Sequence, residues 1–201
     1  MMDEEILSLF AARRGHFRFE SGHHGDLWLD IPLAYVNPKP LRRYAIELAR
    51  LLVAHNIGAV CGPLVEGALL AQTVAEEICA EFYFAEQFVQ SPSDGLYPVG
   101  YRIPKALRAG VRGKRIAIVD DVINAGSAVR GTAKDLRACG ARIAAIGALL
   151  TLGAPATSLA KSLDAPLETL SQIPKNELWE PSACPMCAAG IALDESASSR
   201  E

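Results

Sequence analysis

Short apolar runs alternate with segments of helical periodicity along the chain, and this alternation limits the fold more than any other feature. The predicted strands that contain these apolar residues are 57–61, 82–88, 115–119 and 142–150. The helical segments that accompany them are residues 41–52, 69–78 and 127–140. Strands that alternate with helices form a parallel sheet, so we expect an α/β fold whose ligands bind beyond the carboxyl ends of the strands.

A different pattern precedes this region. Residues 15–31 alternate apolar and other side chains around a Gly-rich turn, the period-2 pattern of two paired strands. The apolar members are Phe17, Phe19, Leu27, Leu29 and Ile31. We therefore expect a small β-hairpin ahead of the parallel sheet.

Composition narrows the class of protein. The chain has 201 residues, half of them hydrophobic, and a net charge of -3, which fits one globular domain. No block of Lys and Arg suggests nucleic-acid binding, and no apolar run reaches the roughly 18 residues of a membrane span. The start MMDEEILSLF is acidic before its apolar run, the reverse of a secretory signal, so we expect a soluble, cytoplasmic protein.

The stretch RIAIVDDVINAGSAV, residues 115–129, carries the strongest functional signal. Asp120 and Asp121 follow an apolar strand, and the small residues 124–127 then lead into a helix. Bare amide groups at a helix start bind phosphate, while neighbouring carboxylates suit ribose hydroxyls and Mg²⁺. The alternative is an ordinary turn with Ser127 as the helix N-cap.

Taken as a whole, this stretch resembles the phosphoribosyl-pyrophosphate (PRPP) signature of the type I phosphoribosyltransferases. Three further segments resemble the orotate branch of that family: GHFRFESGHHGDLWLD, CGPLVEGALLAQTVAEE and ELWEPSACPMCAAGIALD. The resemblance implies a Rossmann-like fold with a mostly parallel sheet, flanking helices and a small N-terminal hood. It further implies one domain, with a hood at about 1–37, a core at about 38–160 and a C-terminal extension at about 161–201.

The resemblance also implies an activity and site residues. The enzyme would transfer phosphoribosyl from PRPP to orotate, releasing pyrophosphate, with Mg²⁺ bound through the substrate and a homodimer as the working form. Asp120 and Asp121 would be catalytic. The PRPP-binding residues would be Asp120, Asp121, Val122, Ile123, Asn124, Ala125, Gly126, Ser127 and Ala128. The pyrophosphate loop would be Gly62, Pro63, Leu64, Val65, Glu66 and Gly67, and the base pocket in the hood Phe19, Ser21, Gly22, His23 and Trp28.

Three departures from the orotate pattern keep other functions open. The loop AEQFVQSPSDGLYPVGYR, where the family has basic residues, has Gln87 in place of one and only Arg102 at its end. The segment ALLTLGAPA lacks the Arg that would meet the orotate carboxylate, and Glu20 adds a negative charge before Ser21. The alternatives are transfer to another purine or pyrimidine base, or PRPP binding for regulation with little catalysis.

Cys184 and Cys187 form a Cys-x-x-Cys motif with the spacing of half a zinc site. No second such motif exists, so the other ligands would have to come from a His, a second subunit or the remaining cysteines, Cys61, Cys79 and Cys139. We therefore favour a turn with two reduced thiols over zinc. A metal site of His16, His23 and Asp26 is a weaker interpretation than a polar hairpin turn.

Overall fold

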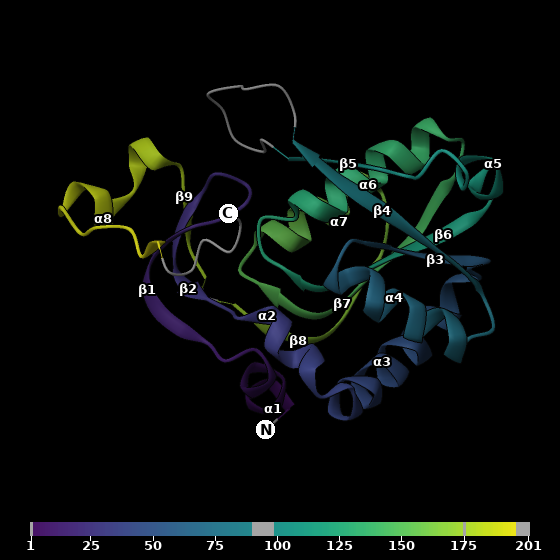
Figure 1. The fold of residues 1–201 in the computed structure, drawn as a ribbon, viewed down its shortest axis with the longest axis horizontal. Helices are drawn as coiled ribbons and strands as arrows, with labels where there is room; N and C mark the ends of the chain where they lie inside the picture. Colours follow the sequence, from purple (N-terminus) through teal and green to yellow (C-terminus); the bar gives the residue numbers. More distant parts are fainter. Residues whose placement is uncertain (1, 90–98, 175, 196–201) are drawn as a thin grey trace.

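The computed structural model describes residues 2–89, 99–174 and 176–195, and its main element is a six-stranded sheet (Figure 1). The sheet order is β5 (Val99–Arg102), β4 (Glu81–Val89), β3 (Ala59–Pro63), β6 (Arg115–Ile123), β7 (Arg142–Leu152), β8 (Leu167–Ile173). Only β5 is antiparallel to its neighbour. The expected α/β class with a mostly parallel central sheet is confirmed.

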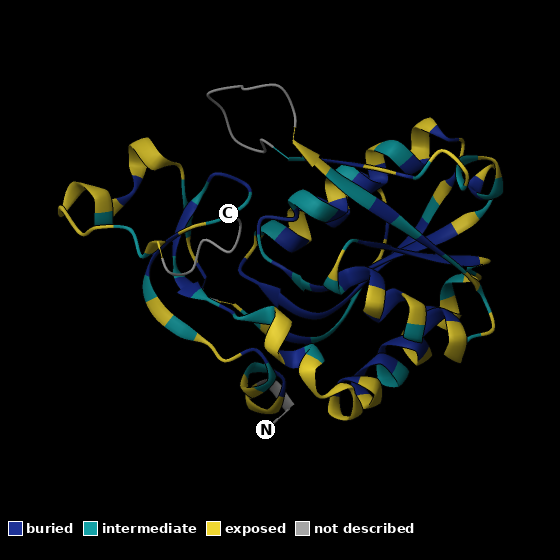
Figure 2. Cartoon of the chain, viewed as in Figure 1, coloured by how far each residue is buried: buried dark blue, intermediate teal, exposed yellow. Residues whose placement is uncertain are grey.

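Helices cover both faces of this sheet (Figures 1 and 2). The helices of the described residues are α1 (Met2–Leu9), α2 (Ile31–Val36), α3 (Pro38–Leu52), α4 (Glu66–Glu77), α5 (Arg108–Val111), α6 (Ser127–Ala138), α7 (Pro155–Leu163) and α8 (Pro185–Ala188), with short 3₁₀ turns η1 (Val53–His55) and η2 (Pro181–Ala183). Of these, α8 lies beside the hood, away from this sheet (Figure 1). Ala117 and Val119 of β6 pack in one core with α3 and α4, while Ile116 and Ile118 pack in the other with α6 and α7. Burial on both faces explains why residues 116–119 are continuously apolar.

The strand β6 is longer than its apolar run. Val122 and Ile123 pair with Leu150 and Thr151 of β7, so the strand ends at Ile123 rather than at Val119. Asp120 and Asp121 therefore lie within the strand, where pairing with β7 holds the backbone in place. The stretch from Gln90 to Gly100 is predicted by its sequence to be a loop; its last two residues, Val99 and Gly100, belong to β5 instead, and residues 90–98 lie outside the described residues.

A second, three-stranded sheet forms the hood. It consists of β1 (Arg13–Arg18), β2 (His24–Trp28) and β9 (Leu178–Trp179), all antiparallel. The expected hairpin is confirmed, but its third strand comes from the C-terminal segment. Because β8 from that same segment belongs to the large sheet, the two sheets do not follow the consecutive divisions 1–37, 38–160 and 161–201 expected from the sequence.

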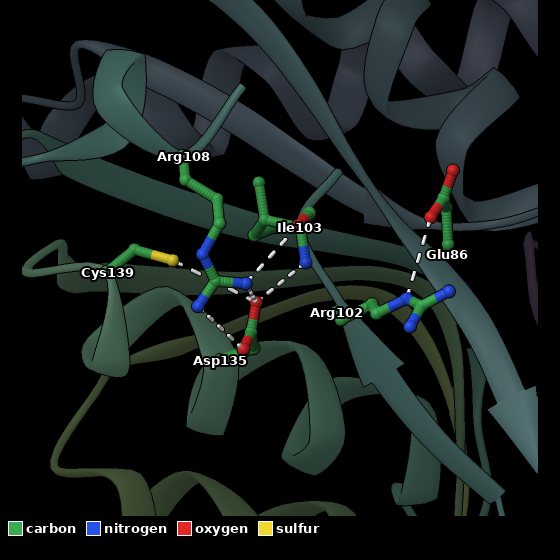
Figure 3. A network of polar contacts seen from close by, with 6 residues as sticks. All are labelled: Glu86, Arg102, Ile103, Arg108, Asp135 and Cys139. Atoms are coloured by element: carbon green, nitrogen blue, oxygen red, sulfur yellow. Dashed lines mark hydrogen bonds and ion pairs between the residues drawn. The ribbon is translucent and has the colours of Figure 1, made fainter. Parts of the chain in front are cut away.

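A polar network fastens α6 to the elements before it (Figure 3). The Asp135 carboxylate on α6 accepts hydrogen bonds from the Ile103 backbone N–H at 2.7 Å and from both terminal nitrogens of Arg108 at 3.0 and 3.3 Å. A two-pronged, partly buried pair of this kind fixes orientation as well as distance. It holds the helix whose first turn lies at the ligand edge of the sheet.

None of the helices in the described ranges combines the length and the apolar character that crossing a bilayer requires.

Candidate functional site

A cleft of about 560 Å³ lies between the hood and the carboxyl ends of β3 and β6. Most of the predicted site residues line it: Phe19, Ser21, Trp28, Pro63, Leu64, Val65, Glu66, Gly67, Asp120, Asp121, Val122, Asn124, Ala125, Gly126, Ser127 and Ala128. Four of the predicted residues do not line it, namely Gly22, His23, Gly62 and Ile123. Segments far apart in the sequence thus meet at one edge of the sheet, as the parallel topology requires.

The two aspartates are buried at the floor of the cleft. Asp120 is 8% exposed and Asp121 3%, and Asp121 accepts hydrogen bonds from the Val122 N–H at 2.6 Å and the Tyr35 hydroxyl at 3.1 Å. Burial raises the pKa of Asp121 to about 7, and Glu66 adds to the rise. Burial, followed by the charge of Asp121, also raises the pKa of Asp120 well above its usual range. Two buried acids without a cation need a partner that donates hydrogen bonds.

The loop after β6 presents its backbone to the cleft. Gly126 has φ +74°, a conformation that glycine adopts without strain, and it is the N-cap of α6. The C-terminal segment holds Asn124 in place, because the side-chain oxygen of Asn124 accepts a 2.9 Å hydrogen bond from Asn176. Small side chains and the start of a 12-residue helix leave amide groups available to an anion.

The loop after β3 packs tightly against the acidic pair. A Cβ on Gly62 would lie 2.2 Å from the Gly67 carbonyl oxygen, and a Cβ on Gly67 would lie 2.5 Å from Asp120 Oδ1. The role of Gly62 is therefore close backbone packing below the cleft, which explains why it does not line the cavity. The Tyr35 hydroxyl, 2.8 Å from the Glu66 carbonyl oxygen, ties α2 to this loop.

The hood contributes aromatic surface. The rings of Phe19 and Trp28 are parallel to within 3°, with centroids 6.1 Å apart, and the Trp28 indole N–H donates to Asp30 at 2.8 Å. Ser21 is buried, and its hydroxyl lies 3.1 Å from Nδ1 of His23, which does not line the cleft. Phe19 and Trp28 therefore give the cleft a flat apolar wall suited to a planar ring.

Glu20 is the centre of a cluster that the sequence did not reveal. Its carboxylate accepts hydrogen bonds from Gln87 Nε2 at 2.9 Å, from the Tyr101 hydroxyl at 2.9 Å and from Ser127 Oγ at 3.3 Å. Gln87 and Glu20 were singled out only as departures from the basic pattern. In the structure they are partners, because Gln87 of β4 supplies a donor to the acid of the hood.

The charge lining the cleft is mostly negative. Glu20, Glu66, Asp120 and Asp121 line it, and Arg18 is the only cationic side chain among the described lining residues. Arg102, the cation at the end of the loop that departs from the basic pattern, is engaged elsewhere. It pairs with Glu86 at 3.7 Å (Figure 3). It also lies over the Phe88 ring. An anionic ligand would therefore have to bring cations of its own.

Comparison with known proteins shows which family the chain resembles in sequence. The family model described as "Phosphoribosyl transferase domain" matches residues 38–179. Orotate phosphoribosyltransferase of Helicobacter pylori (strain ATCC 700392 / 26695) is 30% identical, with 91% of each chain covered. The enzyme of the same name from Caldanaerobacter subterraneus subsp. tengcongensis is 27% identical, with 96% of each covered.

Solved structures show the same fold at lower identity. Orotate phosphoribosyltransferase from Aeropyrum pernix superposes with a TM-score of 0.63 at 18% identity, covering 86% of this chain and 94% of that one. Adenine phosphoribosyltransferase from Thermoanaerobacter pseudethanolicus gives a TM-score of 0.64 at 22% identity, covering 85% and 99%. The fold is thus shared by proteins named for two different bases.

Proposed function

We propose that this protein transfers phosphoribosyl from PRPP to orotate and releases pyrophosphate in its cleft. The premise is that the chain belongs to the phosphoribosyltransferase domain family. One observation carries the proposal: a buried acid pair and a loop of bare amides face an aromatic wall across a single cleft. The names of the relatives at 26 to 30% identity support orotate as the acceptor.

Each side of the cleft has a part in this reaction. The carboxylates of Asp120 and Asp121 would accept hydrogen bonds from the two ribose hydroxyls. The amides of residues 124–128 would bind the 5′-phosphate, and the loop 62–67 would lie beside the pyrophosphate. The new bond forms between a ring nitrogen of the base and the anomeric carbon, while the bond from that carbon to pyrophosphate breaks. The rate then depends on positioning and on charge stabilisation.

Mg²⁺ suits this cleft because the lining residues are rich in carboxylate oxygens and poor in cations. We propose that the ion enters bound to the oxygens of PRPP, with no dedicated protein site. When bound, it supplies positive charge to the leaving pyrophosphate. The chain's own residues supply hydrogen bonds and orientation.

The base would stack on the hood. The parallel rings of Phe19 and Trp28 offer a surface to a planar pyrimidine, and Arg18 places one cation on the same side of the cleft. We propose that Arg18 meets the orotate carboxylate in place of the Arg that the segment 148–156 lacks. An Arg18→Gln variant should then raise the KM for orotate while leaving the affinity for PRPP unchanged.

A second acceptor base is favoured by two observations. The fold superposes on an adenine phosphoribosyltransferase as well as it does on an orotate phosphoribosyltransferase, with TM-scores of 0.64 and 0.63. In addition, the cleft has little positive charge to bind a base that carries a carboxylate. The same shortage of cations supports a third function, binding of PRPP with slow turnover for regulation.

A single assay separates these functions. Protein, PRPP and Mg²⁺ are mixed with orotate, and the ultraviolet absorbance of orotate is followed, with pyrophosphate release measured for a panel of other bases. We expect loss of orotate absorbance with matching pyrophosphate release. Release with another base alone would select the second function. Calorimetric binding of PRPP without any release would select the third.

Two wider expectations also remain proposals. We propose a homodimer, supported by four exposed apolar side chains on α2 and around the start of α4, two helices in contact: Leu33, Val36, Val65 and Leu69. Light scattering coupled to gel filtration should give a mass of two chains for the wild type. For the Leu69→Asp variant it should give the mass of one chain. We propose a cytoplasmic location, for which the absence of disulfides among the described cysteines is the support.

A further inference from the structure

Four metal-binding side chains from two distant parts of the chain converge within the hood. His16 comes from β1 and His24 from β2, whereas Cys184 precedes α8 and Cys187 lies in it. One ligand atom from each lies within 4.8 Å of all the others. We propose that these four residues bind a structural zinc ion, independently of what the cleft binds.

The distances between the ligand atoms fit a tetrahedral ion. Nε2 of His16 lies 3.1 Å from Nδ1 of His24, 3.4 Å from the Cys184 sulfur and 3.8 Å from the Cys187 sulfur. The Cys187 sulfur lies 3.3 Å from Nδ1 of His24. Ligands about 2.0 Å (nitrogen) and 2.3 Å (sulfur) from a tetrahedral Zn²⁺ are roughly 3.3 to 3.8 Å apart. These four distances lie near the values for zinc, and the remaining two pairs of ligand atoms are within 4.8 Å.

The hydrogen bonding of His16 prepares it as a ligand. Its Nδ1 lies 2.7 Å from the Ile191 carbonyl oxygen, which only accepts, so Nδ1 carries the proton. In the neutral ring Nε2 then has a free lone pair, and this is the atom directed at the other three groups. Metal-bound histidines are oriented by such a second hydrogen bond.

Burial also favours an ion at this point. His16 is 3%, His24 5% and Cys184 2% exposed, so three of the four proposed ligands are shielded from water. Unlike a catalytic zinc, the site has four protein ligands and leaves no position open for substrate. Two sulfur and two nitrogen ligands in a tetrahedral set select zinc over the harder cations.

The site has a mechanical purpose. After Ile173, Cys184 is the only buried apolar side chain described, and it belongs to neither apolar core of the described residues. The pairing of β9 with β2 covers only two residue pairs. A small unit with so little core needs another link, and zinc would join this C-terminal segment, at the outer end of the hood, to the hairpin (Figure 1). The same hairpin presents Phe19 and Trp28 to the cleft.

The zinc proposal differs from the interpretation of Cys184 and Cys187 as a simple turn of two reduced thiols. The missing ligands come from two histidines eight residues apart, which a hairpin brings face to face. Cys61, Cys79 and Cys139 take no part, since the first lies in β3, the second follows α4 and the third ends α6.

The alternative metal set of His16, His23 and Asp26 does not assemble. The ring of His23 lies against Ser21, and Asp26 forms an ion pair with Arg14. Only His16 of these three belongs to the proposed site.

The test is the metal content of the full chain, purified with a non-chelating reductant. We expect about one zinc ion per chain by inductively coupled plasma mass spectrometry. Replacing zinc by Co²⁺ should give the visible bands of a tetrahedral ion and a thiolate charge-transfer band. Cys187→Ser is the main variant, because Cys187 is exposed and its loss leaves no buried cavity. It should lose the ion and the charge-transfer intensity.

Cys79→Ser is the matched control, since Cys79 is another exposed cysteine outside the set. It should keep one zinc per chain. A strong chelator should lower the Tm of the wild type and of Cys79→Ser, but not that of Cys187→Ser. Wild-type protein without zinc and without cobalt bands, or Cys187→Ser that keeps a full equivalent of zinc, would overturn the proposal.

Discussion

The carboxylate of Glu20 lies 3.3 Å from the hydroxyl of Ser127, so an acid of the hood contacts the first residue of the helix proposed to bind phosphate. Gln87 and Tyr101 hold the carboxylate in place. A negative charge at this position opposes the binding of an anion at the same helix start. PRPP would have to displace Glu20 or bind against its charge.

Removing that charge should strengthen PRPP binding. Glu20→Gln keeps the shape of the side chain, and we expect the Kd of PRPP with Mg²⁺ to fall about three- to tenfold by calorimetry. Glu76→Gln, on the exposed side of α4, is the control and should leave the Kd unchanged. An unchanged or higher Kd in Glu20→Gln would show that the acid does not oppose the ligand.

Adding a cation at position 87 should raise turnover. Gln87 lines the cleft, and an Arg there would offer donors to the leaving pyrophosphate, for which one well-placed donor contributes about tenfold or more to kcat. Because Glu20 would also pair with that Arg, the gain should be larger in the double variant Gln87→Arg, Glu20→Gln. The rate of pyrophosphate release measures both. Gln172→Arg, at the exposed position of β8, should change nothing.

A methyl group at Gly67 should damage the site directly. The added Cβ would lie 2.5 Å from Asp120 Oδ1, so either the loop or the carboxylate must move. We expect Gly67→Ala to weaken PRPP binding at least about tenfold. Gly58→Ala is the control, because its nearest neighbour would be 3.9 Å away. Equal affinities for the two variants would contradict the tight packing described.

The acidic pair should reduce stability at high pH. The pKa of Asp121 is raised from 3.8 to about 7 in the folded protein, so the folded state binds more protons than the unfolded state between these values. Stability from this group is therefore present at low pH and lost as pH rises towards 7. Asp121→Asn removes the loss and should raise the free energy of unfolding by about 4 kcal/mol at pH 8, with little gain at pH 4. Denaturant melts at both pH values, with Glu77→Gln as control, measure the difference.

The elements of the core could be predicted because their signals are local. The run 115–119 and the periodic segment 127–140 each show their structure within one window, and the acidic pair between them marks the cleft. The length of β6 could not be read in this way. Its end at Ile123 depends on pairing with Thr151 of another strand.

The contacts across the cleft could not be predicted either, because each joins separate segments. One such contact joins Glu20 of the hood turn to Gln87 of β4 and to Ser127 of α6. The relative positions of these three segments are set only when the sheet folds. Arg18 reaches the cleft from a hairpin whose register shifts between Arg14 and Phe17, and a shift of one residue changes which face a side chain occupies.

The pairing of β9 with β2 was hidden for a similar reason. It spans more than 150 residues of sequence and only two residue pairs, Gly25 with Leu178 and His24 with Trp179. Without that pairing, no signal in the sequence brings the two histidines to Cys184 and Cys187.

The central claim, that Asp120 and Asp121 hold the sugar of PRPP, is tested most directly by calorimetry of PRPP and Mg²⁺ with wild-type protein and with the double variant Asp120→Asn, Asp121→Asn. Circular dichroism and a melting curve first establish that the variant is folded. We predict saturable binding to the wild type and no measurable heat of binding to the folded double variant. Equal affinity of both proteins for PRPP would contradict the claim.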